Sequence, residues 1–220
     1  MEYKNLLKQY ADVRIERNYV ILEKFFNHDL SYMISLLNLR WEILISLLLE
    51  NNNASITLTN HFVERMLKLS LIQLETKDVN LSEPEKYSKR VIHAHNQYDR
   101  LTLDATIKHN KKKHLISEDE FHYLSTVCKS LRDSYSHAQV GMINKSQPEK
   151  LSGYMFSIED VKNKLTKGET DFTKTKIELP KESPTMVQLN QTESARENAL
   201  EYFTRIYDIL VNIEERLQVM

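Results

Sequence analysis

Apolar residues recur at helical spacing through most of the first 140 residues. Because i, i+3, i+4 and i+7 positions share one face of a helix, this spacing predicts amphipathic helices rather than strands. The first three predicted helices cover 2–27, about 30–50, and about 59–75 with Thr59 as N-cap. The fourth begins at a capping box at 82–85, and the fifth begins at a second capping box at 117–120. Thr192 is the predicted cap of a last helix.

The residues that break helices are confined to one part of the chain. All three glycines lie between Gly141 and Gly168, and Pro84 is the only proline before residue 141. A chain that avoids both residues for so long is expected to be helical. The sequence therefore predicts an all-α fold, a bundle of five to six long helices forming one domain over 1–220. Residues 1–28 form an N-terminal helical extension.

An irregular insertion is predicted at 141–190, before the last helix. Ser157 as cap and Gly168 as stop mark a short helix within it, next to a short strand pair.

Composition restricts the class of protein. The single cysteine, Cys128, excludes an internal disulfide framework and fits a reducing compartment. The most apolar run, 43–49, is too short to span a bilayer, and the first residues do not resemble a signal peptide. We therefore expect a cytoplasmic protein without membrane contact. The net charge of −1 gives no global nucleic-acid signature, so RNA binding would depend on local patches.

Arg132 and His137 are the first candidate for chemistry, near the end of the fifth predicted helix. Arginine suits phosphate oxygens, and histidine exchanges a proton near neutral pH. Together they supply what RNA cleavage without a metal requires. Arg132 and His137 are five residues apart, so on a helix their side chains point about 140° away from each other. Asp133 and His137 are four residues apart and share one face of the helix. By composition alone, the stretch from Arg132 to His137 also fits an ordinary polar end of a helix.

The pattern Arg132-x4-His137, with polar Asp133 directly after the arginine, resembles the motif of the HEPN domain superfamily. Many members of that family also carry Glu-x3-Lys on an earlier helix, and Glu64 and Lys68 match it here. The helical architecture resembles that of the family over about residues 29–220. At the level of individual residues, the resemblance is limited to these two short motifs.

The resemblance implies a metal-independent endoribonuclease that acts as a homodimer with a composite active site. His137 would move protons, Arg132 would stabilise charge on the phosphate, and Asp133 would orient the imidazole. Glu64 and Lys68 would support the site. The implied products are a 2′,3′-cyclic phosphate and a 5′-hydroxyl. Such stand-alone members are toxins or phage-defence effectors, so an antitoxin or defence-system protein is a further implied partner.

Three adjacent lysines, Lys111, Lys112 and Lys113, are a candidate RNA-binding patch or, alternatively, a solvated turn. No histidine pairing suits a metal site, and no glycine-rich phosphate loop is present, so we expect no metal and no cofactor. Two alternatives to the enzyme stay open. One is a catalytically inactive HEPN-like protein that binds RNA, a nucleotide or a partner protein, and the other is an unrelated helical scaffold.

Overall fold

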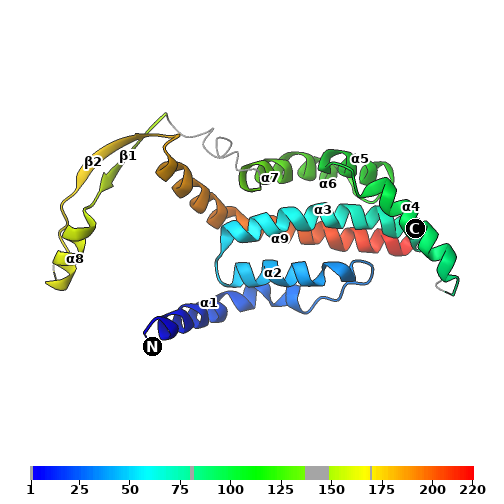
Figure 1. Cartoon of the computed structure of the whole chain (residues 1–220), viewed down its shortest axis with the longest axis horizontal. Helices are drawn as coiled ribbons and strands as arrows, with labels where there is room; N and C mark the ends of the chain where they lie inside the picture. Colours follow the sequence, from blue (N-terminus) through cyan, green and yellow to red (C-terminus); the bar gives the residue numbers. More distant parts are fainter. Residues whose placement is uncertain (1, 80–81, 137–148, 169) are drawn as a thin grey trace. The chain divides into compact units, whose positions relative to one another are not determined.

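The computed structural model describes residues 2–79, 82–136, 149–168 and 170–220. The fold is all-α, as predicted, with one small sheet (Figure 1). The chain divides into two compact units, Met1–Ala138 with Ala195–Met220, and Gln139–Ser194. The helices of the first unit are α1 (Glu2–Phe26), α2 (Leu37–Leu48), α3 (Asn52–Thr76), α4 (Pro84–Tyr98), α5 (Leu103–Lys112), α6 (Glu118–Tyr123), η2 (Leu124–Cys128), α7 (Lys129–Tyr135) and the part of α9 (Pro184–Val219) from Ala195 onward.

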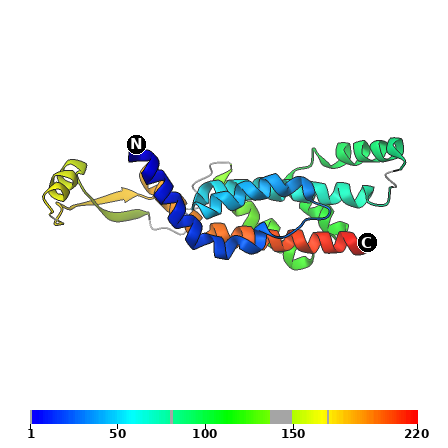
Figure 2. The ribbon, with the colours of Figure 1, turned by 90° about the horizontal axis from the view of Figure 1, so that it is seen from below.

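The long helix α3 is the centre of the first unit. It contacts α2, α4, α5 and α7, and α9 lies beside it in both views (Figures 1 and 2). Hydrogen bonds join the two helices at each end, from Tyr202 to Asn60 and from Lys77 to the carbonyl of Leu217. Because residue numbers rise together along both helices, α3 and α9 run parallel.

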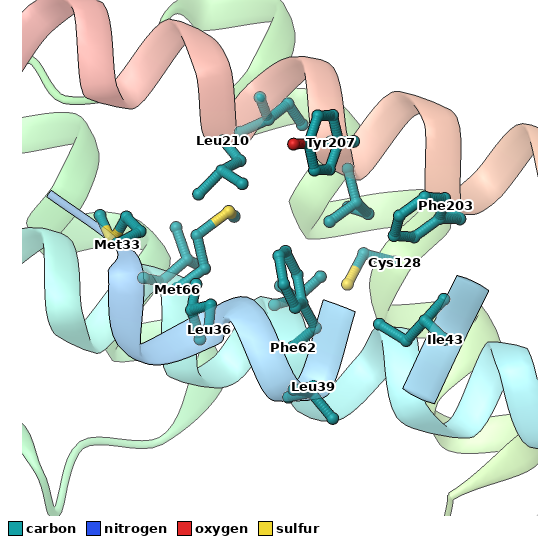
Figure 3. Close-up of a cluster of buried hydrophobic side chains, with 14 of the residues drawn as sticks. Met33, Leu36, Leu39, Ile43, Phe62, Met66, Cys128, Phe203, Tyr207 and Leu210 are labelled. Atoms are coloured by element: carbon teal, nitrogen blue, oxygen red, sulfur yellow. The ribbon is translucent and has the colours of Figure 1, made fainter. Parts of the chain in front are cut away.

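A single hydrophobic core lies between these helices. Phe62, Met66, Phe203 and Leu210 are fully buried and point into the same interior (Figure 3). By contrast, α1 buries only its C-terminal part, through Leu22 and Phe25, and leaves large apolar side chains exposed nearer its start: Tyr3, Leu6, Leu7, Tyr10 and Val13. The C-terminal part of α1 therefore anchors this helix to the core.

The second predicted helix begins later than expected, and the reason is tertiary. Residues 30–33 are not helical, and a short 3₁₀ turn, η1 (Ile34–Leu36), precedes α2. The backbone amides of Ser31, Tyr32 and Met33 donate to the carboxylate of Glu214 on α9, at 2.8–3.0 Å. Charge-assisted hydrogen bonds of this kind fix residues 31–33 against α9, ahead of η1.

The predicted caps Thr59 and Thr192 are wrong. The α3 helix begins at Asn52, and the Thr59 hydroxyl donates to the carbonyl of Ser55 inside the helix, at 2.8 Å. The α9 helix begins at Pro184, ahead of Thr192. In α9 the residues before Ala195 are not buried, so the apolar pattern starts later than the helix. In α3 the first turns do face the core, through Ser55 and Ile56, but this stretch carries too few apolar residues to reveal the helix.

The fourth predicted helix is two helices. The chain turns after Tyr98, where α4 ends, and the Thr102 side chain caps α5 by accepting from Ala105. The predicted capping box at 82–85 is absent, because Glu83 occupies the N-cap position and makes no side-chain cap bond. Pro84 does occupy the first turn, as predicted.

The capping box at Ser117 and Glu120 is confirmed, since both of its hydrogen bonds are present. The helix that it opens contains a π-helical turn, η2, between α6 and α7. A π turn holds more residues than an α turn, so side chains after it are rotated by about one residue, roughly 100°.

The second unit contains an antiparallel pair, β1 (Lys150–Met155) and β2 (Thr175–Pro180), with Gly153 opposite Ile177. The short helix α8 (Ile158–Thr166) follows β1 (Figure 1). Ser157 caps it by accepting from the Asp160 amide, and Gly168 follows it with a left-handed φ of 75°. The short helix and the strand pair confirm both predictions for this segment.

No helix in the described ranges combines the length and apolar character needed to cross a bilayer.

Candidate functional site

The candidate site lies where α7 packs against α3. Nε of Arg132 on α7 is 2.8 Å from Oε1 of Glu64 on α3, and both side chains are roughly one-third exposed. The two motifs that the sequence carries separately therefore meet in one ion pair. The planar guanidinium presents several N–H donors in a fixed fork, a geometry that suits the binding of phosphate oxygens.

Asn60 joins the end of α7 to the core. Its side-chain amide donates to Oγ of Ser136 at 3.0 Å, and its carbonyl oxygen accepts from the hydroxyl of Tyr202 at 2.7 Å. That hydroxyl also lies 3.1 Å from Sγ of Cys128. Asn60, Tyr202 and Cys128 are all buried, so this chain of contacts fixes Ser136 relative to the interior.

These contacts show which face of α7 meets α3. Leu131 and Tyr135, the predicted inward residues, are partly buried and pack against the core, and Ser134 between them is buried. The contacts to α3 come from Arg132 and Ser136, one residue later in each case. Arg132 and Ser136 therefore lie at the edge of the inward face of α7, where its polar side chains reach α3.

Cys128 is a core residue, as its position on the apolar stripe predicts. Burial raises the pKa of its thiol to about 11, so the thiol is protonated and weakly nucleophilic at neutral pH. Burial also raises the pKa of Tyr202 well above its ordinary value of 10. Both groups are neutral hydrogen-bonding partners at physiological pH.

Of the remaining predicted site residues, Asp133 lies close to the cluster of Arg132, Glu64 and Cys128, and Lys68 contacts another part of the chain. Asp133 is partly buried, and its charge contributes to raising the pKa of Cys128, which places it close to the same cluster. The Lys68 ammonium donates to the backbone carbonyl of Asp99, after the end of α4. His137 lies outside the described residues.

The predicted RNA-binding lysines lie apart from this cluster. Lys111 pairs with Glu118 at 2.8 Å, and Lys113 pairs with Glu75 at 3.1 Å, whereas Lys112 is exposed. The hydrogen bond from Lys113 lowers the pKa of Glu75. Eleven residues separate Glu75 from Glu64, which is about 16 Å along α3. Two of the three lysines thus already have carboxylate partners.

Asn60 and Tyr202 are the members of this cluster that sequence reasoning missed. Asn60 is one turn before Glu64 on the same side of α3, so the helical phase of Glu64 could have indicated it. Tyr202 carries no such signal, because α9 is far away in sequence. Within the ranges that the structure describes, no group of three or more His, Cys, Asp or Glu side chains could hold a metal ion.

Comparison with protein-family models, with curated proteins and with solved structures gives no significant match to this chain.

Proposed function

We propose that the protein is a metal-independent endoribonuclease of HEPN type. The observation that carries the proposal is the contact between Arg132 and Glu64, because it joins the two motifs on which the resemblance rests. Catalysis requires positive charge where negative charge develops on phosphorus, and the partly exposed guanidinium supplies it.

In the proposed reaction the ribose 2′-oxygen attacks phosphorus and the bond to the 5′-oxygen breaks. His137 takes the proton from the 2′-hydroxyl or gives one to the leaving oxygen, and Asp133 orients it. The products are a 2′,3′-cyclic phosphate and a 5′-hydroxyl. The active form in this proposal is a homodimer with a composite site. The biological setting is a toxin or phage-defence system, restrained by a partner protein.

The test is cleavage of total RNA by the purified chain in EDTA, with analysis of the new ends. We expect cleavage to survive EDTA and to fall at least about a hundredfold in Arg132→Ala and in His137→Ala, which is the usual contribution of one acid–base or charge-stabilising group. Arg196→Ala, an exposed cation on α9, is the matched control. Equal activity in all four proteins would rule out this site.

The same ion pair also favours a second function, an inactive HEPN-like protein that binds RNA or a partner. Since Glu64 partly neutralises Arg132, the pair would then simply tether α7 to α3. In that case Arg132→Ala would lower stability without removing any cleavage. Thermal unfolding of Arg132→Ala and of Glu64→Gln, measured beside the cleavage assay, separates the two functions.

A further inference from the structure

A row of basic side chains follows α3 past the candidate site. His61, Arg65 and Lys68 are separated by four and then three residues, so they fall within about 60° of one another around the helix. We propose that this row, named here the α3 strip, binds the phosphate backbone of single-stranded RNA. The inference rests on the proposed function, because it assigns the path of the substrate through that site.

The position of the α3 strip follows from two contacts. Asn60 contacts Ser136 and Glu64 contacts Arg132, so α3 and α7 run antiparallel with these residues in register. His61 precedes Glu64 by about 4.5 Å along the axis, and Lys68 follows it by about 6 Å. The α3 strip therefore extends to both sides of the Arg132–Glu64 pair, as the backbone flanking a scissile phosphate would.

The basic groups of the α3 strip are not paired with carboxylates in the part of the chain described. His61 and Arg65 are exposed and make no hydrogen bond or ion pair with another described residue. Lys68 donates to the carbonyl of Asp99, so its charge has no carboxylate partner in the part of the chain described. Lys111 and Lys113 differ, because each is paired with a glutamate. A cation that is already neutralised releases fewer counterions on binding a phosphate.

Side-chain type favours single-stranded RNA over an acidic protein surface. Imidazole rings and guanidinium planes stack on unpaired bases, and both types are present in the α3 strip beside lysine. An acidic protein surface would need positive charge alone and would not need side chains that stack on bases.

The experiment measures binding of a single-stranded 2′-O-methyl RNA, which lacks the attacking hydroxyl, to the full chain at several salt concentrations. In the double variant Arg65→Gln with Lys68→Gln, we expect affinity to fall at least about fivefold near 100 mM salt. The slope of log affinity against log salt should fall by about 1.4, or 0.7 per lost phosphate contact. Lys4→Gln with Lys8→Gln, two exposed lysines on α1, removes the same charge and should leave both quantities unchanged.

A competing double variant is Lys111→Gln with Lys113→Gln. If that variant weakens RNA binding and the α3 variant does not, the inference is overturned. The same holds if both double variants and the α1 control lose affinity equally, since net charge alone would then explain binding. If wild type binds the RNA through the α3 strip but never cleaves unmodified RNA, the proposed nuclease function is wrong and RNA binding by the α3 strip is still supported.

Discussion

Asn60 shows how one buried side chain can hold a surface motif in place. Both ends of its amide are used, one toward the core hydroxyl of Tyr202 and one toward Ser136, the residue before His137 in the sequence. A buried amide that keeps only one of its partners loses much of the free energy that the pair supplied.

Tyr202→Phe tests this arrangement. The variant leaves the carbonyl oxygen of Asn60 without its donor, so we expect the free energy of unfolding to fall by about 1–3 kcal/mol. Chemical denaturation with a circular dichroism readout measures it. Ser136→Ala is the comparison, because its hydroxyl is at the exposed end and its loss should change stability by no more than about 1 kcal/mol. A larger loss of unfolding free energy in Ser136→Ala than in Tyr202→Phe would contradict the idea that the core hydroxyl of Tyr202 holds Asn60 in place.

At the scale of elements, most helices could be predicted and several of their ends could not. The absence of glycine and the apolar spacing suffice to predict helices over α1 and α3. The segment before α2 is held by Glu214, which is about 180 residues away and accepts from the amides of residues 31–33. Local patterns contain no information about such a partner.

The same limit holds for the candidate site. Each motif is visible in the sequence, but their contact depends on how α7 is rotated against α3. That rotation is set by tertiary packing, with Ser134 buried and Leu131 and Tyr135 packed against the core. Patterns therefore indicate Arg132 and Glu64 individually, and the helical phase of Glu64 points to Asn60, while Tyr202 emerges only from packing.

Glu120 gives an element-scale prediction about pH. Burial alone would raise its pKa, but hydrogen bonds from Arg216, from the Ser117 amide and from Asn212 outweigh burial and lower it below 4.5. A lowered folded-state pKa means that this stability is present above the unfolded pKa and is lost as pH falls through the folded pKa.

We expect Glu120→Gln to lose about 1–3 kcal/mol of unfolding free energy at pH 7, and the difference from wild type to shrink below about pH 4.5. Denaturant titrations across that range measure both. Glu118→Gln, whose carboxylate is exposed, should change stability by at most about 1 kcal/mol at either pH. A Glu120→Gln deficit that stays constant down to pH 3 would show that charge is not the cause.

At the scale of the whole molecule, the proposed enzyme makes a prediction about assembly. The five-residue spacing of Arg132 and His137 in the sequence predicts side chains about 140° apart on a helix, so a composite site would combine the arginine of one protomer with the histidine of its partner. Mixing Arg132→Ala protein with His137→Ala protein, after mild dissociation and reassociation, should then restore part of the cleavage activity. Each mixed dimer would contain one complete site and one empty site.

Analytical ultracentrifugation establishes that mixed dimers form, and the EDTA cleavage assay reads their activity. Mixed dimers that remain as inactive as either variant would indicate that both residues act within one chain. A wild-type protein that is active as a monomer would exclude the composite site altogether.

The π turn at η2 also bears on how this chain can diverge among descendants. A deletion inside a regular helix usually misaligns everything that follows it. Between Leu124 and Cys128, however, losing one residue would return the segment to α-helical geometry and leave the helix continuous. Arg132 would then face away from Glu64 by roughly 100°. In the proposed nuclease, losing one codon at this position would therefore separate the two motif residues while keeping the helix unbroken.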